Sequence, residues 1–297
     1  MSNQETAPNQ PWTILKLLNW AASYFQSHQI DSPKATAEIL LAHALDLKRI
    51  DLYLQYDRPL NKAELAVFKK LVLRRTKREP VAYIVGTKEF WSLPLRVDKA
   101  VLIPRPDTER LVDVALDLLR RETPGRPLQI LELGTGSGAI TLSLASEQAA
   151  HLFFASDISP AATALAKRNA HENNLTNIHF FVGDWLEALR PSTMPFDMIV
   201  SNPPYIPSDD IPGLQPEISK YEPLSALDAG PDGLACLRHL VQHAWIYLRP
   251  GGHLVLEIGF DQKDALTDFV QAHKRYQDFT VHTDYGGHDR VVCMTRV

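Results

Sequence analysis

The sequence predicts an α/β fold in which a doubly wound, mostly parallel sheet follows a small helical bundle. Two observations lead to this prediction. From Leu128 onward, short apolar runs alternate with helical segments, which is the pattern of a parallel sheet with helices on both faces. Before that, residues 12–79 show apolar residues at helical spacing. The 297 residues are enough for one large or two modest domains, and the change of pattern favours two.

The chain is expected to begin with a tail and a bundle. Residues 1–11 are polar and are predicted to be a disordered tail, and residues 12–79 form the N-terminal helical bundle. Within it, Ser32 followed by Pro33 is typical of a helix start, with a hydroxyl cap and a proline at the first helical position. Asn61, with a glutamate three residues on, resembles a capping box that opens another helix.

A linker is expected between the bundle and the sheet. Residues 80–103 hold branched and aromatic side chains punctuated by glycine and proline, which predicts a β-hairpin linker. Residues 104–297 are assigned to the second domain. It opens on a proline-rich segment in which Asp107 is placed to cap the helix that starts at Glu109. Capping does not explain Arg105, which stands between two prolines.

The first three strands of the sheet end in residues that suit a nucleoside. Strand 128–133 enters a loop made of Gly134, Thr135, Gly136, Ser137 and Gly138. Glycines in such a loop let a ligand approach the backbone. Strand 152–156 ends at Asp157, about 20 residues beyond that loop, where a carboxylate can accept ribose hydroxyl protons. The third strand is followed by Asp184, which could receive an adenine amino group, and by Trp185, which either walls the ring or packs in the core.

The fourth strand, 196–201, ends in the tetrapeptide Asn202, Pro203, Pro204 and Tyr205. The prolines stop the strand because they cannot donate to a sheet ladder. The asparagine amide and the Pro203 carbonyl can accept the two hydrogens of a planar NH2 group. The tyrosine ring offers a face on which that group can stack, and it also favours a sulfonium methyl. A tight turn would explain the prolines but not the whole tetrapeptide.

Beyond the tetrapeptide the pattern predicts a loop at 206–227, a helix at 233–247, a sharp turn at 249–252, a strand at 253–258 and a helix at 262–276. The loop is long enough to be a functional cover. Two branched runs near the end of the chain predict a terminal antiparallel hairpin that closes the sheet.

Composition narrows the class of function. Lys and Arg number 31 against 35 Asp and Glu, so the net charge of -4 gives no overall attraction to nucleic acid or to an anionic membrane. Cys236 and Cys293 are too few for a disulfide framework or a metal site, and they suit a reducing cytoplasm. No segment resembles a leader peptide or reaches the ~18 apolar residues of a membrane helix. We therefore expect a cytoplasmic protein without a metal.

The glycine loop alone leaves three classes of function open. Gly134, Gly136 and Ala139 also fit the dinucleotide pattern, so an NAD-dependent dehydrogenase is a rival. Against this class, no histidine or lysine directly follows the fourth strand, where it could exchange a proton with the substrate of hydride transfer. A non-catalytic nucleoside-binding module would need the glycines and Asp157 but not the tetrapeptide. The tetrapeptide is best explained by methyl transfer to nitrogen.

These motifs resemble those of class I S-adenosylmethionine-dependent amino-methyltransferases. The positions that carry the likeness are Glu132 to Gly138, Asp157, Asp184 with Trp185, and the tetrapeptide that starts at Asn202. DNA adenine methyltransferases share the tetrapeptide, so it indicates the shape of the acceptor rather than its identity. The segments Leu102 to Glu109 and Tyr221 to Leu227, with the helical bundle, resemble the peptide chain release factor glutamine methyltransferases, the HemK-type family. The similarity runs from about Trp12 to Arg296.

The resemblance implies a class I methyltransferase fold and a defined reaction. A methyl group would pass from S-adenosylmethionine to the glutamine amide nitrogen in the Gly-Gly-Gln motif of class I release factors, giving N5-methylglutamine. Residues 104–297 would be the methyltransferase domain, and 12–79 would recognise the release factor. DNA adenine-N6 methylation and methylation of a ribosomal-protein glutamine stay open as alternatives. Neither a membrane nor direct nucleic-acid binding is expected.

The resemblance also assigns site residues. Those implied to bind the cofactor are Gly134, Thr135, Gly136, Ser137, Gly138, Asp157, Asp184, Trp185 and Asn202. Those implied to bind the substrate are Asn202, Pro203, Pro204, Tyr205 and Arg105. Of these, Asn202, Pro203 and Tyr205 are the implied catalytic residues.

Overall fold

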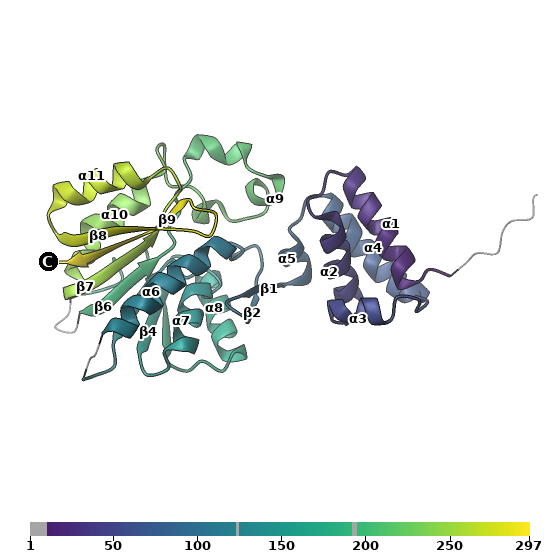
Figure 1. Ribbon diagram of the computed structural model, residues 1–297, viewed down its shortest axis with the longest axis horizontal. Coiled ribbons are helices and arrows are strands. Elements are labelled where there is room, and N and C mark those ends of the chain that lie inside the picture. The colour runs from purple at the N-terminus through teal and green to yellow at the C-terminus, as the bar shows by residue number, and fades with distance from the viewer. Residues whose placement is uncertain (1–10, 123–124, 192–194) are drawn as a thin grey trace, which may run out of the picture. The chain divides into compact units, whose positions relative to one another are not determined.

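The computed structural model describes residues 11–122, 125–191 and 195–297. They form two compact units, one ending at Gly86 and one beginning at Thr87 (Figure 1). All but the last residue of the predicted tail lies outside the described residues.

The first unit is a bundle of helices, as the apolar periodicity predicts. Its helices are α1 (Ile14–Ser27), α2 (Pro33–Leu45), α3 (Arg49–Leu54), α4 (Lys62–Thr76) and α5 (Val81–Val85). Phe25, Leu41 and Phe68, one from each of the three longest helices, are buried in a common core. Helix α4 opens with the expected capping box: the Asn61 side chain accepts from the Glu64 amide at 2.9 Å, and the Glu64 carboxylate accepts from the Asn61 amide at 2.8 Å.

Three details of this unit differ from prediction. Ser32 has a φ of 47° and its side chain makes no capping hydrogen bond, so the predicted hydroxyl cap of α2 is wrong. Helix α3 has six residues, too few for periodicity to reveal it. The residues of α5 form a helix although their branched and aromatic side chains favour a strand. Tyr83 and Ile84 of α5 are buried, so tertiary packing overrides the local preference, and Gly86 ends the helix in the left-handed conformation.

The second unit opens with the predicted hairpin, formed by β1 (Thr87–Phe90) and β2 (Leu93–Arg96). Both turn residues, Trp91 and Ser92, have positive φ, which matches the twist of a two-residue hairpin. The Trp91 amide donates to Glu109 and its indole N–H donates to Glu147, each at 3.1 Å. The hairpin is shorter than predicted because α5 replaces its first part, and it packs on the unit that carries the large sheet.

The large sheet has seven strands within the described residues. They are β3 (Gln129–Leu133), β4 (Leu152–Asp157), β5 (Ile178–Val182), β6 (Phe196–Ser201), β7 (Leu248–Glu257), β8 (Tyr276–Thr283) and β9 (Asp289–Arg296). Their order across the sheet is β5-β4-β3-β6-β7-β9-β8, with the first five parallel and β9 antiparallel to both of its neighbours. The predicted doubly wound sheet with a terminal antiparallel hairpin is therefore confirmed.

Helices cover both faces of this sheet (Figure 1). The helices of the second unit are α6 (Glu109–Arg121), α7 (Ala139–Glu147), α8 (Pro160–Glu172), α9 (Pro216–Ser219), α10 (Ala235–His243) and α11 (Lys263–His273). Successive residues of a strand point to opposite faces. Accordingly, Ile130 and Val200 pack in one core with α6, α7 and α8, and Leu131 and Ile199 pack in another with α10 and α11.

Several predicted boundaries in this unit are wrong. Strand β7 begins at Leu248, so the residues predicted as a sharp turn lie inside it. A register shift between β6 and β7, between Phe196 and Met198, accommodates the glycines there. Helix α10 ends at His243 and a 3-10 turn follows, and Tyr276 starts β8 rather than ending α11.

The segments beside the site also differ from prediction. Asp107 does not cap α6, because Pro106–Thr108 form a 3-10 turn ahead of that helix. The loop predicted at 206–227 contains the short helical turns Ser208–Gly213, α9 and Leu224–Ala226. Proline and glycine interrupt this stretch so often that no helical periodicity develops, and the sequence pattern therefore predicts a loop.

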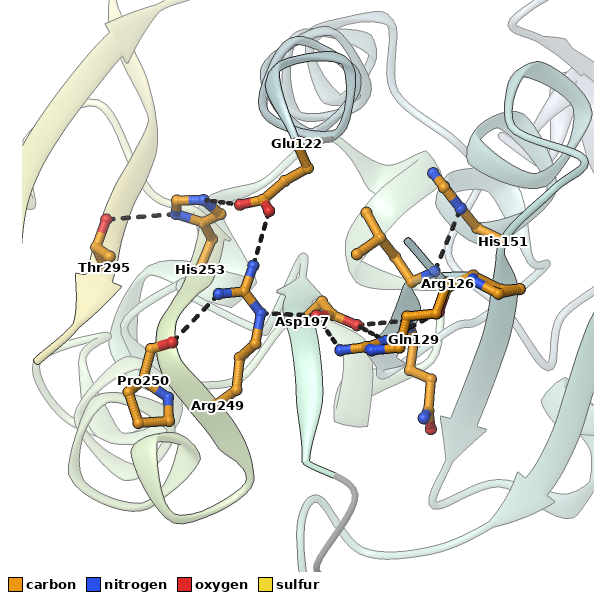
Figure 2. Close-up of polar contacts among 11 residues, drawn as sticks. Glu122, Arg126, Gln129, His151, Asp197, Arg249, Pro250, His253 and Thr295 are labelled. Atoms are coloured by element: carbon orange, nitrogen blue, oxygen red, sulfur yellow. Dashed lines mark hydrogen bonds and ion pairs between the residues drawn. The ribbon is translucent and has the colours of Figure 1, made fainter. Parts of the chain in front are cut away.

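Ion pairs and hydrogen bonds converge on the buried Asp197 at the start of β6 (Figure 2). Arg126 donates to its two oxygens at 2.8 and 2.9 Å, Arg249 donates at 2.7 Å, and the Gln129 amide donates at 2.8 Å. Burial alone would raise the pKa of Asp197, but these donors, led by Arg126, lower it. Arg249 also pairs with Glu122 at 2.9 Å. This Asp197 network joins β3, β6 and β7 at the ends opposite the site described next.

Candidate active site

A cavity of about 240 Å³ lies at the carboxyl ends of β3, β4 and β6. Strand β3 stands between β4 and β6, so the strand order reverses here, which is where doubly wound sheets bind ligands. The sequence-predicted residues on its wall are Arg105, Gly134, Thr135, Gly136, Ser137, Asp157, Asp184, Trp185, Asn202 and Pro204. The fold thus gathers segments that are far apart in the sequence.

Gly138, Pro203 and Tyr205 do not belong to the cavity wall. Gly138 has a φ of 86°, and a Cβ there would lie 2.6 Å from Leu142 and 3.2 Å from Ala166. Its absent side chain therefore lets α7 pack against α8. Pro203 is buried, and the Tyr205 ring packs against the core that contains α10 and α11. The ligand contacts assigned to these three residues stay predictions.

The glycine loop offers its backbone to the cavity at Gly136. This residue has a φ of 55°, and a Cβ built on it would meet nothing within 4 Å, so a side chain would project into open space. The Gly136 amide donates to Asp157 at 2.8 Å, and the Thr135 amide donates to the Ser156 carbonyl at 2.8 Å. The loop is therefore pinned to β4, and a ligand can approach its main chain.

Asp157 combines two tasks at the end of β4. One oxygen accepts from the Gly136 amide and the other accepts from the Ser159 amide at 2.9 Å. Burial raises the pKa of Asp157, and these two amides oppose that rise. Each carboxylate oxygen has room for a second donor. The side chain can thus hold the glycine loop and still accept the hydroxyls of a ribose.

Glu132 is a wall residue to which the sequence analysis gave no role of its own. It is almost fully buried, and its Oε2 accepts from the Thr135 hydroxyl at 2.7 Å and from the Thr141 amide at 3.1 Å. Burial raises the pKa of Glu132 to about 7, although both threonines oppose the rise. This carboxyl braces the glycine loop against the start of α7. The sequence does contain a signal for a role of this residue, because a charged side chain is unusual inside an otherwise apolar strand.

Trp185 and Ile158 supply apolar surface to the cavity. The Trp185 ring lies over the glycine loop, since a Cβ on Gly134 would be 3.8 Å from it. Ile158, which the sequence analysis missed, is 57% exposed although it is aliphatic, and it directly follows Asp157. Asp184 is exposed beside them and offers an acceptor. Apolar faces with a nearby carboxylate suit a flat heterocycle that carries an amino group.

Asn202 has a fixed orientation at the cavity wall. Its Nδ2 donates to the Thr108 hydroxyl at 3.2 Å, which leaves its Oδ1 to accept a hydrogen from a ligand. Thr108 also lines the cavity and immediately precedes α6. Sequence reasoning missed Thr108, because a threonine beside a helix start is usually explained by capping.

Arg105 is engaged by a partner from the loop after β6. Its Nη2 donates to both oxygens of Glu222 at 2.7 and 2.8 Å. Glu222 is buried, which raises its pKa, and Arg105 opposes that rise. The ion pair joins the two segments on which the family resemblance rests. Arg105 lines the cavity, but its guanidinium serves at least in part to hold these segments together.

The described residues contain no group of three or more His, Cys, Asp or Glu side chains arranged to bind a metal ion. Among the same residues, no helix is both long enough and apolar enough to cross a membrane.

The sheet order and the position of the cavity are those of the class I methyltransferase fold. Solved structures of similar fold include "delta-N METTL16 MTase domain", with a TM-score of 0.51 and 16% identity over 69% of this chain and 90% of that chain. Another is "Human methyltransferase 10 domain containing protein", with a TM-score of 0.50 and 17% identity over 69% of this chain and 88% of that chain. The family model "Methyltransferase small domain" matches residues 108–211.

Sequence relatives narrow the class to one family. The model "PrmC N-terminal domain" matches residues 16–86. The protein named "Release factor glutamine methyltransferase" in Geobacter sulfurreducens is 43% identical over 281 residues, covering 95% of this chain and 96% of the relative. The protein of that name in Aliivibrio fischeri is 46% identical over 261 residues, covering 88% and 89%. The chain therefore belongs to the release factor glutamine methyltransferase family, as the resemblance predicts.

Proposed function

We propose that the protein transfers a methyl group from S-adenosylmethionine to the side-chain amide nitrogen of the glutamine in the Gly-Gly-Gln motif of a class I release factor, giving N5-methylglutamine. The observation that carries this proposal is the fixed amide of Asn202, whose Oδ1 is left as an acceptor on the wall of the cavity that holds the glycine loop. The family to which the chain belongs favours glutamine as the acceptor.

The cavity residues fit S-adenosylmethionine. The ribose hydroxyls would donate hydrogen bonds to Asp157, and the backbone at Gly136 would lie close to the ligand. Trp185 and Ile158 would face the adenine ring. The adenine amino group would donate a hydrogen bond to Asp184. When bound, S-adenosylmethionine supplies a methyl group on a positively charged sulfur. These side chains would hold it at the reversal of strand order, next to Asn202.

The acceptor side of the site has to overcome a weak nucleophile. A carboxamide nitrogen has a delocalised lone pair, so positioning and electrostatics must supply most of the rate. The Asn202 Oδ1 and the Pro203 carbonyl would accept the two N–H hydrogens and push electron density toward nitrogen. The new bond would join the nitrogen to the methyl carbon, the electron pair of the broken carbon–sulfur bond would stay on sulfur, and one N–H proton would pass to solvent by way of the oxygen that accepts it. No strong base is required, since the nitrogen becomes acidic only as the methyl bonds.

The rival classes of function fit less well. A hydride-transferring dehydrogenase needs a proton-managing side chain, and the described wall of the cavity contains neither histidine nor lysine. DNA adenine methylation would use the same tetrapeptide, but the net charge of -4 offers no general attraction to DNA. A ribosomal-protein glutamine is the nearest alternative acceptor, because it presents the same amide.

We also propose that the first unit recognises the release factor and that the protein works in the cytoplasm. Trp12, Trp20 and Leu54 on the first unit are all more than two fifths exposed. Exposed aromatic and aliphatic side chains of this kind are typical of protein-binding surfaces.

The proposal is tested by incubating the protein with labelled S-adenosylmethionine and, separately, with a release factor, adenine-containing duplex DNA and ribosomal protein. We expect label on the release factor alone. Label on DNA alone would replace the proposal with adenine methylation, and label on ribosomal protein alone would keep the chemistry but change the substrate.

A further inference from the structure

A second buried carboxyl lies beside the tetrapeptide, outside the cavity wall. Glu257 is the last residue of β7 and is 1% exposed. Its Oε1 accepts from the Tyr205 hydroxyl at 3.3 Å. Its other oxygen, Oε2, makes no hydrogen bond of regular geometry within the described residues. A buried carboxyl with a vacant oxygen is costly, so its presence needs an explanation.

Thr108 links this carboxyl to Asn202. The Thr108 hydroxyl accepts the hydrogen bond from Asn202 Nδ2 and also lies close enough to Glu257 to lower the pKa of that carboxyl. A hydroxyl that accepts from an amide still has its own hydrogen to donate. The vacant oxygen of Glu257 is an acceptor that this hydrogen would satisfy. Asn202 and Tyr205, at the two ends of the tetrapeptide, would then be connected through one carboxyl.

The charges around Glu257 come from several elements. Burial raises the pKa of Glu257 to about 7. Thr108, Arg290 of β9 and Tyr205 oppose this rise, and Asp107, in the turn before α6, adds to it. The carboxyl therefore changes its charge near neutral pH, where an ionised form can accept from both hydroxyls and a protonated form loses part of that capacity.

We propose that Glu257 is the positioning residue of the acceptor site: it holds Tyr205 directly and Asn202 through Thr108, so that the Asn202 Oδ1 faces the incoming amide. This inference deepens the proposed function and rests on it for the identity of the acceptor. Glu257 itself does not touch the reacting atoms.

A first test observes the link without turnover. The side-chain amide signal of Asn202 is followed by 15N NMR through a pH titration and is identified by its loss in Asn202→Ala. In the wild-type protein we expect it to shift with a midpoint near pH 7, and in Glu257→Gln we expect that shift to disappear. A signal that titrates identically in both proteins would overturn the proposal. This result does not depend on which acceptor is methylated.

A second test measures the rate on whichever acceptor takes the label. In Glu257→Gln, which keeps the shape but offers one acceptor oxygen, we expect kcat to fall about 10-fold while the Kd for S-adenosylmethionine is unchanged. The wild-type kcat should fall as the pH is lowered through about 7, and this pH dependence should be weaker in the variant, where Glu132 still titrates in that range. A variant with wild-type kcat and pH profile would contradict the proposal.

Two further variants separate positioning from loss of structure. Tyr276→Phe removes another buried tyrosine hydroxyl, one that makes no regular hydrogen bond within the described residues, and should leave kcat unchanged. Thr108→Val removes the link, and combined with Glu257→Gln it should cost little more than either change alone. Fully multiplicative losses would show that the two residues act independently and would overturn the inference.

If the wild-type protein methylates no glutamine, the proposed function fails, and the NMR titration still decides the role of Glu257.

Discussion

Two side chains of the tetrapeptide are held by residues from other elements, since Asn202 donates to the Thr108 hydroxyl and Tyr205 donates to the Glu257 carboxylate. The tetrapeptide, the glycine loop and Asp157 could be selected from residue types and spacing, because each follows the end of a predicted strand. Thr108 and Glu257 could not, since one resembles a helix-start residue and the other the last residue of a strand. Both make hydrogen bonds to residues more than fifty positions away in the sequence. Such contacts appear only when the sheet order is known.

For Asn202→Ala we expect at least a ~100-fold loss of kcat with a nearly unchanged Kd for S-adenosylmethionine. The change removes an acceptor at the reacting amide and leaves the cofactor contacts of Asp157 and the glycine loop in place. Steady-state kinetics and calorimetry measure the two quantities. Asn177→Ala, which removes an asparagine bonded to the His151 carbonyl, is the matched control and should retain wild-type kcat. Unchanged turnover in Asn202→Ala would remove this residue from the mechanism.

For Asp157→Asn we expect the affinity for S-adenosylmethionine to fall about 30-fold, or about 2 kcal/mol, because a charged acceptor for the ribose hydroxyls is lost. The asparagine oxygen can still accept from one of the two amides that Asp157 now holds, so the loop should be preserved. Calorimetric titration gives the Kd, and thermal unfolding of the free protein checks the fold. A normal Kd would refute the ribose contact.

At the scale of elements, the type of sheet was predictable from the sequence, but the ends of several strands and helices were not. Alternating apolar runs and helices predict a doubly wound, mostly parallel sheet, and two branched runs predict the terminal hairpin, whereas the strand order comes from the structure. The start of β7 was missed because a glycine pair normally ends an element, whereas here a register shift admits it. Helix α5 was missed because packing of Tyr83 and Ile84 outweighs their preference for strands.

The Asp197 network yields a prediction about the stability of these elements (Figure 2). Asp197→Ala should lower the free energy of unfolding by about 2 kcal/mol, because it removes the buried carboxylate that accepts from Arg126, Arg249 and the Gln129 amide. Denaturant unfolding measures this loss. The control is Asp117→Ala, which breaks an exposed pair with Arg120 on α6 and should cost less than about 1 kcal/mol. Equal losses in free energy of unfolding would show that the Asp197 network stabilises the fold no more than an exposed ion pair does.

At the scale of the molecule, two units divide the work that we propose. The cavity, its glycine loop and the tetrapeptide all lie in the unit that begins at Thr87. The other unit contributes a buried helical core and exposed aromatic side chains, including Trp20 stacked on Tyr24 with ring centroids 5.2 Å apart. The helical nature of this unit follows from periodicity. Its role as a recognition unit rests on the resemblance and needs a test of its own.

Trp20→Ala provides that test. If the first unit binds the release factor, the KM for the release factor should rise about 10-fold, since interface tryptophans commonly contribute this much. The values of kcat and of the Kd for S-adenosylmethionine should not change. Ile246→Ala, which truncates an exposed aliphatic residue of the other unit, is the control and should leave KM unchanged. An unaltered KM in Trp20→Ala would exclude this tryptophan from the recognition surface.

The most direct test of the central claim is to locate the transferred methyl group. A class I release factor is incubated with the protein and S-adenosylmethionine, digested, and sequenced by tandem mass spectrometry. The account predicts one added methyl on the side-chain amide of the glutamine in the Gly-Gly-Gln motif, and none when Asn202→Ala replaces the wild-type protein. A methyl group on any other residue would contradict it. A glutamine that stays unmodified after the reaction has run to its end point would contradict it as well.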